Sequence, residues 1–66
     1  MYKRVEAYII LSGISKRELA KSLGISYNTL NLKLRGKSDF SLDEASEIKR
    51  ILKADEPIET LFAKSA

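Results

Sequence analysis

The sequence predicts a small all-α domain of five helices. Apolar residues recur at helical spacing in several segments, and serines stand where three of these segments begin. No segment alternates apolar and polar residues over the length of a strand, and no Asn-Gly or Asp-Gly pair signals a hairpin. A chain of 66 residues has room for one domain, which we expect to span residues 1–66.

Apolar spacing and punctuation residues set the expected bounds of the helices. The first three each end at a glycine, which readily takes the left-handed backbone that terminates helices: Gly13, Gly24 and Gly36. The expected helices cover residues 2–12, 16–23, 27–35 and 42–53. A last helix begins near Pro57, because proline suits the first turn of a helix.

Serine caps are expected at three helix starts. Ser15 should accept the amide of Glu18, whose carboxylate reaches back to the Ser15 backbone in a capping box. Ser41 and Glu44 repeat this box, and Ser26 caps the helix between them. Each cap contributes about 1 kcal/mol to stability. Together the three caps specify where these helices start.

Composition excludes several classes of function. The chain has neither Cys nor His, which excludes disulfides, zinc fingers and catalysis by a cysteine or an imidazole. The longest apolar run, 7–11, is far shorter than the roughly 20 residues of a membrane span. Three acidic residues share one solvated turn, without a nucleophile nearby: Asp43, Glu44 and Glu47. We therefore expect no enzyme, metal, cofactor, small-molecule ligand or membrane association, and a cytoplasmic location.

Charge is unevenly distributed along the chain. Residues 1–37 carry eight basic and two acidic residues, whereas residues 38–66 carry four basic and seven acidic ones, within a net charge of +3. One interpretation is that each helix simply has a solvated charged face. The other is that one face of the domain meets an anion, and the charge asymmetry alone does not decide between the two.

The helices over 16–23 and 27–35 are joined by only three residues, 24–26. Two short helices joined by such a turn, with a glycine in it, form a helix-turn-helix. Ala20 is small where the second helix would press against the first. An ordinary helical hairpin in a small bundle is the alternative, but spacing, caps and basic charge together favour a DNA-reading unit.

Residues 15–26, Ser-Lys-Arg-Glu-Leu-Ala-Lys-Ser-Leu-Gly-Ile-Ser, resemble the helix-turn-helix of phage repressors and Cro proteins. The resemblance continues over 30–37 and 41–52, and 58–62 is similar to the last short helix of that family. It implies a compact five-helix, lambda-repressor-like domain that binds operator DNA, often as a homodimer on a near-palindromic site. It also implies a phage or prophage setting.

The chain departs from the family pattern at Lys16, where the family often has Gln, and in the loop 38–40, which lacks the usual proline. A third departure is Lys33, where the family usually has an apolar residue. At about 100° per residue, Leu34 lies about 40° from Leu30 around the helix and Leu32 lies about 200° away. We therefore expect Leu34 to be buried, against Ile9 of the first helix. Leu32 should face outward.

The resemblance implies that the helix over 27–35 enters the major groove, where its early residues meet base edges. The base-reading positions are then Tyr27, Asn28, Asn31 and Leu32. Asparagine pairs with adenine and leucine packs on a thymine methyl group. The alternatives are that Tyr27 belongs partly to the core and that Leu32 contacts a second copy of the chain.

The expected phosphate-binding residues lie at both ends of the helix-turn-helix: Lys16, Arg17, Ser26, Arg35 and Lys37. Free amides and the dipole at the start of the helix over 16–23 favour a phosphate there. Solvated surface charge is the alternative for each basic residue, and it is the expectation for Lys21 and Lys33. Phe40 is expected to fill the core against the helix over 42–53, with a dimer contact as the alternative.

The predicted function is therefore a sequence-specific transcriptional regulator that binds double-stranded DNA. The alternative on the same fold is a protein-interaction module, such as an antitoxin or an antirepressor-like partner.

Overall fold

The structure, a computed structural model, describes residues 1–64 and contains five α-helices. They are α1 (Lys3–Ser12), α2 (Lys16–Leu23), α3 (Tyr27–Leu34), α4 (Leu42–Leu52) and α5 (Ile58–Leu61). The part of the chain so described contains no strand, and the all-α, five-helix prediction is confirmed. None of these helices is long and apolar enough to cross a membrane.

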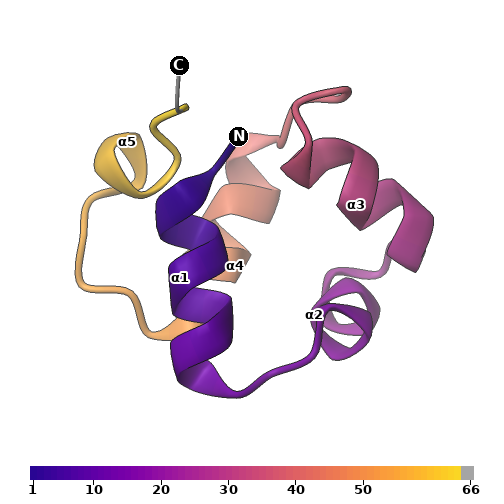
Figure 1. Ribbon diagram of the computed structural model, residues 1–66, viewed down its shortest axis with the longest axis horizontal. Coiled ribbons are helices and arrows are strands. Elements are labelled where there is room, and N and C mark those ends of the chain that lie inside the picture. The colour runs from indigo at the N-terminus through magenta and orange to yellow at the C-terminus, as the bar shows by residue number, and fades with distance from the viewer. Residues whose placement is uncertain (65–66) are drawn as a thin grey trace.

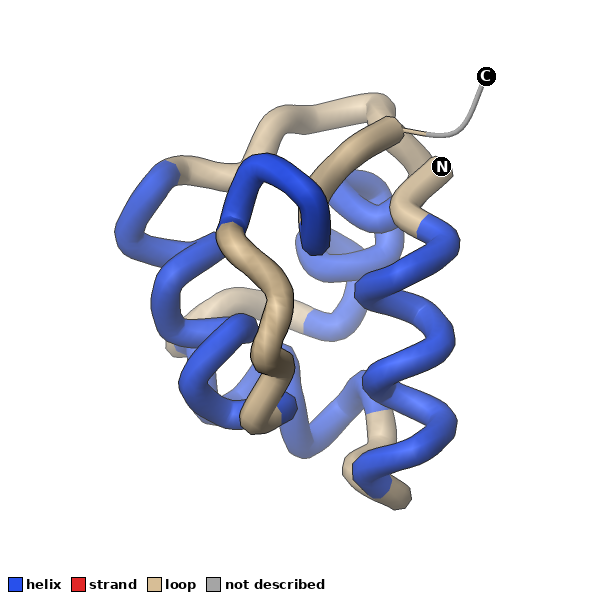
Figure 2. Tube along the Cα trace, turned by 90° about the vertical axis from the view of Figure 1, so that its left-hand side faces the viewer, coloured by secondary structure: helices blue, strands red, loops and turns tan. Residues whose placement is uncertain are grey.

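Helix α4 is the element on which the others assemble. α1, α2 and α5 each pack against α4, and α3 packs against α2. Figure 1 shows α1 in front of α4, with α2 and α3 on one side and α5 on the other. Figure 2 shows α1 running along one edge of the molecule from the N-terminus. The helix-turn-helix therefore forms one flank of the domain.

Each helix contributes one fully buried side chain to a single core. These side chains are Val5, Leu19, Leu30, Ile48 and Leu61. Leu34 is buried in the same core as Ile9, whereas Leu32 is 47% exposed. The predicted rotation of α3, with Leu34 inward and Leu32 outward, is confirmed.

Three helix bounds differ by one residue from the prediction. α1 begins one residue late, because Tyr2 has a non-helical backbone and is buried, 4% exposed, in the core. α3 ends one residue early, with Arg35 as its C-cap. α4 also ends one residue early, because Lys53 takes the left-handed conformation with φ of 54°.

The three serine caps are present, but only one capping box is complete. Ser15, Ser26 and Ser41 each accept the amide three residues further on, at 3.1, 3.0 and 3.1 Å. At Ser41 the backbone amide also donates to Glu44 Oε1 at 2.9 Å, which completes the box. At Ser15 the Glu18 carboxylate instead accepts from the serine hydroxyl at 3.2 Å. The capping box predicted at Ser15 is therefore only half correct. The Glu18 carboxylate accepts a hydrogen bond from the Ser15 hydroxyl and not from the Ser15 backbone amide.

The turn between α2 and α3 is closed by two backbone hydrogen bonds. The amide of Ile25 donates to the carbonyl of Ala20, and that of Gly24 donates to Lys21, both at 3.1 Å. This is the Schellman pattern, and it requires the φ of +72° that Gly24 adopts. Ser26 then caps α3 at once. All three residues of the turn are therefore held by hydrogen bonds to one of the two helices, which fixes the angle between α2 and α3.

Three aromatic rings close the end of the domain. Tyr2, Phe40 and Phe62 meet edge to face in pairs, with ring centroids 5.3 to 5.8 Å apart. Such pairs add about 0.5–1.5 kcal/mol each beyond the area they bury. Phe40 is half-buried and packs on the core, as expected. The triangle joins the segment before α1, the loop before α4 and the end of α5.

Lys33 is a structural residue rather than the solvated lysine expected from the sequence. Its Nζ donates to Glu44 Oε1 at 2.7 Å and to the carbonyl of Asp39 at 3.3 Å, and its side chain is 14% exposed. The hydrogen bond from Lys33, followed by that from the Ser41 backbone, holds the pKa of Glu44 below its ordinary value of 4.5. Lys33 thus ties α3 to the first turn of α4.

This pair makes stability depend on pH. Because the pKa of Glu44 is lower in the folded chain, its carboxylate adds stability above about pH 4.5, and that contribution is lost as pH falls through the folded-state pKa. Lys33→Met fills the same space without charge. We expect it to lower the unfolding free energy at pH 7 by about 1–3 kcal/mol, because the Glu44 carboxylate loses its charged partner, and to lose less stability than wild type below pH 4.5.

Urea unfolding at pH 7 and pH 3.5 measures both quantities. Lys21→Met is the matched control, because Lys21 is exposed and should leave the pH dependence unchanged. An acid-induced loss as large in Lys33→Met as in wild type would contradict the assignment.

Candidate nucleic-acid interface

The outer face of α3 presents polar side chains to solvent. Asn28 is exposed on the first turn, Asn31 is half-buried, and Leu32 and Arg35 are exposed. Leu30 and Leu34 point the opposite way, into the core. Figure 1 shows α3 on the flank of the domain, with α2 beneath it. The structure therefore brings three of the four predicted base-reading residues onto one accessible face.

The fourth predicted reader, Tyr27, lies at the edge of this face and is half-buried. The guanidinium carbon of Arg17 stands 4.3 Å from the centroid of its ring. This distance is well within the range of a cation–π contact. A predicted phosphate-binding residue on α2 and a predicted reader on α3 are therefore in direct contact.

Lys16 is already engaged within the protein. Its Nζ lies 3.1 Å from Glu6 Oε1, and the two side chains are 36% and 37% exposed. An ion pair this open to water contributes about 0–1 kcal/mol. Lys16 could therefore leave Glu6 and bind another anion, such as a phosphate, at little cost in free energy.

Ser26 is also engaged, as the N-cap of α3. Its hydroxyl oxygen accepts the amide of Thr29 at 3.0 Å, and its proton is donated to the Thr29 hydroxyl at 2.8 Å. The Ser26 side chain therefore orders the first turn of α3.

Arg35 and Lys37 lie just beyond the other end of α3. The amide of Lys37 donates to the carbonyl of Leu32 at 2.9 Å, and that of Gly36 donates to Lys33 at 3.0 Å. These bonds form a second Schellman turn, in which Gly36 has a φ of +81°. The turn holds the backbone, so that both basic side chains project as exposed groups.

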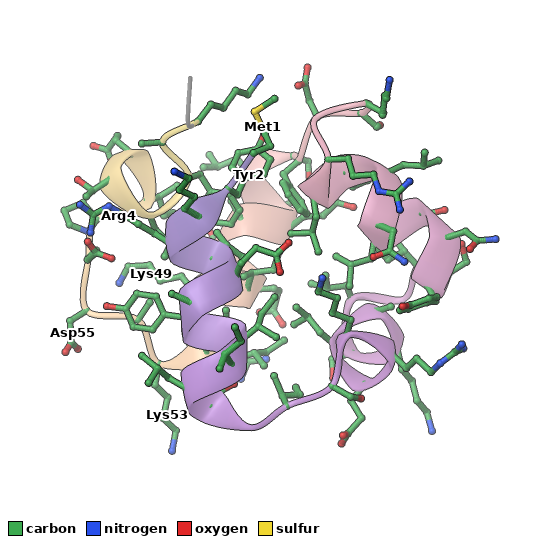
Figure 3. The ribbon with its side chains drawn as sticks, in the orientation of Figure 1. Met1, Tyr2, Arg4, Lys49, Lys53 and Asp55 are labelled. Atoms are coloured by element: carbon green, nitrogen blue, oxygen red, sulfur yellow. The ribbon has the colours of Figure 1, made fainter. Side chains whose placement is uncertain are left out.

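Seven of the eight basic residues of 1–37 fall into two groups, and the eighth, Lys3, is exposed on α1. Three form ion pairs with carboxylates of other segments: Arg4 with Glu56, Lys16 with Glu6, and Lys33 with Glu44. Four exposed residues on α2 and in the turn after α3 have no carboxylate within 4.0 Å among the described residues: Arg17, Lys21, Arg35 and Lys37. We call these four the interface basic set. Figure 3 places Arg4, Lys49 and Lys53 on the side of the molecule away from α2 and α3.

Within residues 1–64, no cluster of acidic side chains is arranged to hold a metal ion. What the surface of α2 and α3 offers is amide groups, an apolar side chain and unpaired positive charge. These groups suit the base edges and phosphates of a nucleic acid.

A family model for the Cro/C1-type HTH DNA-binding domain matches residues 4–62. The chain belongs to this family. No match was found among curated proteins or among solved structures. The Cro/C1-type family is a DNA-binding family and not a family of enzymes, and a domain of this kind binds double-stranded DNA.

The contact between Arg17 and Tyr27 in this Cro/C1-type domain was not predicted from the sequence, because no local pattern indicates a contact between two residues that are ten positions apart and on different helices. Lys21, expected to be only solvated, is exposed and forms no ion pair among the described residues.

Proposed function

We propose that the protein is a sequence-specific transcriptional regulator of the phage Cro/repressor type, which places α3 in the major groove of operator DNA in the cytoplasm. The observation that carries this proposal is the polar outer face of α3, flanked at both ends by the interface basic set. A helix fits the major groove, which is about 12 Å wide. The base-reading side chains in the middle of α3 would face the base edges, and the basic side chains beyond its two ends would face the phosphates of the two strands that border the major groove.

Base reading is assigned to the outer face of α3. Asn28 is exposed and can make a bidentate pair with adenine, and Asn31 lies one turn further on the same face. Leu32 is 47% exposed and can pack against a thymine methyl group. Tyr27, at the edge of this face, completes the proposed set.

Phosphate binding is assigned to the two ends of the α2–α3 unit. Arg17, Lys16 and Ser26 lie at the helix starts, where unpaired amides and the helix dipole attract an anion. Arg35 and Lys37 would hold the backbone at the far end of α3. Phosphate contacts of this kind set affinity and register and carry no direct sequence information.

A homodimer on DNA is the proposed assembly. Beside Phe40 lies an open hollow of about 440 Å³, also lined by Ala45, Ile58 and Phe62. Leu42 stands at its rim and is 72% exposed. A surface that carries a protruding side chain next to a hollow can pair with a second copy of itself across a two-fold axis. Leu42 of each copy would then enter the hollow of the other.

Selection of bound sites from random duplex DNA at fixed salt tests the proposed function. We expect enrichment of two related half-sites about one helical turn apart. A protein that enriches no sequence would contradict the proposal and favour the protein-interaction alternative.

Asn28→Ala tests base reading. We expect a loss of roughly 1–3 kcal/mol on the selected operator and a relaxed preference at one base position, because the amide pair with the base is removed. Titration of operator and of random duplex by fluorescence anisotropy measures both effects. Thr60→Ala, an exposed change on α5, is the control. Equal weakening on both DNAs would remove Asn28 from the readers.

Arg35→Ala and Lys37→Ala test phosphate binding. Each should weaken operator and random DNA alike and lower the slope of log affinity against log salt by about 0.9, since one fewer counterion is released. Lys49→Ala is the control, because Lys49 lies on the side away from α3 (Figure 3). An unchanged slope would show that the residue touches no phosphate.

Leu42→Lys tests the dimer surface. We expect binding to the full operator to weaken at least about ten-fold while binding to an isolated half-site is unchanged, because two buried leucines are lost per dimer. Sedimentation of the protein–operator complex reports its stoichiometry. Leu11→Lys is the matched control, since Leu11 is 81% exposed on α1. Equal effects of both changes would contradict the assigned surface.

A further inference from the structure

The contact between Arg17 and Tyr27 joins the starts of the two helices of the motif. Arg17 is the second residue of α2, and Tyr27 is the first residue of α3. The guanidinium carbon stands 4.3 Å from the ring centroid. The ring is half-buried, and α3 begins at Tyr27 under the Ser26 cap. The aromatic partner is therefore held in place, while the arginine is exposed.

A guanidinium group on an aromatic face keeps its donors available. The cation meets the ring through its face, whereas the N–H bonds point outward in the guanidinium plane. Within residues 1–64, Arg17 has no carboxylate partner, in contrast to its neighbour Lys16. The planar fork of N–H donors is thus oriented before any anion arrives, which lowers the entropy lost on binding.

We propose that Tyr27 is a positioning residue for a phosphate contact: its ring holds Arg17 at the start of α2, ready for one DNA phosphate. This inference rests on the proposed function and changes the role assigned to Tyr27. A tyrosine that reads a base through a hydrogen bond needs its hydroxyl group, whereas a tyrosine that positions Arg17 needs only its ring. Because Tyr27 begins α3, the phosphate held by Arg17 also sets the register of α3 in the groove.

Binding to random duplex DNA tests the inference, because phosphate contacts do not depend on sequence. Arg17→Ala should lower the salt slope by about 0.9. Tyr27→Leu should weaken binding about two- to five-fold. In the Arg17→Ala background the same change should have no further effect, since the residue it positions is gone. Tyr27→Phe keeps the ring and should bind random DNA like wild type.

Two results would overturn the proposal. A loss in Tyr27→Phe as large as that in Tyr27→Leu would show that the hydroxyl acts directly. An undiminished effect of Tyr27→Leu in the Arg17→Ala background would show that the two residues act independently. Failure of the proposed function is a separate result, because the unmodified protein would then enrich no sequence from random duplex DNA, whatever the two variants do. Circular dichroism confirms that each variant is folded.

A measurement without DNA keeps the inference testable even if Tyr27→Leu does not fold. The ring should shift the side-chain proton resonances of Arg17 upfield in the free protein, and Tyr27→Phe should preserve that shift. Random-coil values for Arg17 in the unmodified protein would overturn the proposal.

Discussion

The arrangement of the α2–α3 surface depends on the three-residue turn between these helices. Gly24 reverses the chain with a positive φ, two backbone hydrogen bonds close the end of α2, and Ser26 starts α3 without a spacer. Leu30 then locks the rotation of α3 by entering the core beside Leu19. Because the turn sets the angle and the core sets the rotation, Asn28 faces outward and the start of α3 meets the start of α2.

Ion pairs with neighbouring segments decide which cations remain for DNA. The N-terminal half looks uniformly basic, yet acidic residues reach it from α1, from α4 and from the loop before α5. Lys33 shows the result most clearly, because Glu44 and a backbone carbonyl occupy its ammonium group. Apart from Lys3, the basic residues of 1–37 that form no ion pair among the described residues lie on α2 and in the turn after α3. The interface basic set therefore has four members, half of the eight basic residues counted in 1–37.

Sequence patterns within a few residues predicted most of the fold. The features that were missed depend mainly on contacts between residues far apart in the sequence. The serine caps act over three residues and the glycine ends over a single turn, so both could be located in the sequence. The start of α1 was misplaced because Tyr2 is drawn into the core, and the end of α4 because Lys53 takes a backbone that favours glycine. For the interface, periodicity placed Leu32 outward, but nothing local could show that Arg17 rests on Tyr27.

The far end of α3 is supported by the N-terminal segment as well as by its own turn. The Met1 side chain covers Gly36, where an added Cβ would lie 2.5 Å from its terminal methyl carbon. Figure 3 shows Met1 and Tyr2 together at that end of the molecule. Tyr2 in turn is held by Phe40 and Phe62. The turn that projects Arg35 and Lys37 is therefore braced by the aromatic triangle, which links the packing of α5 to the position of two residues of the interface basic set.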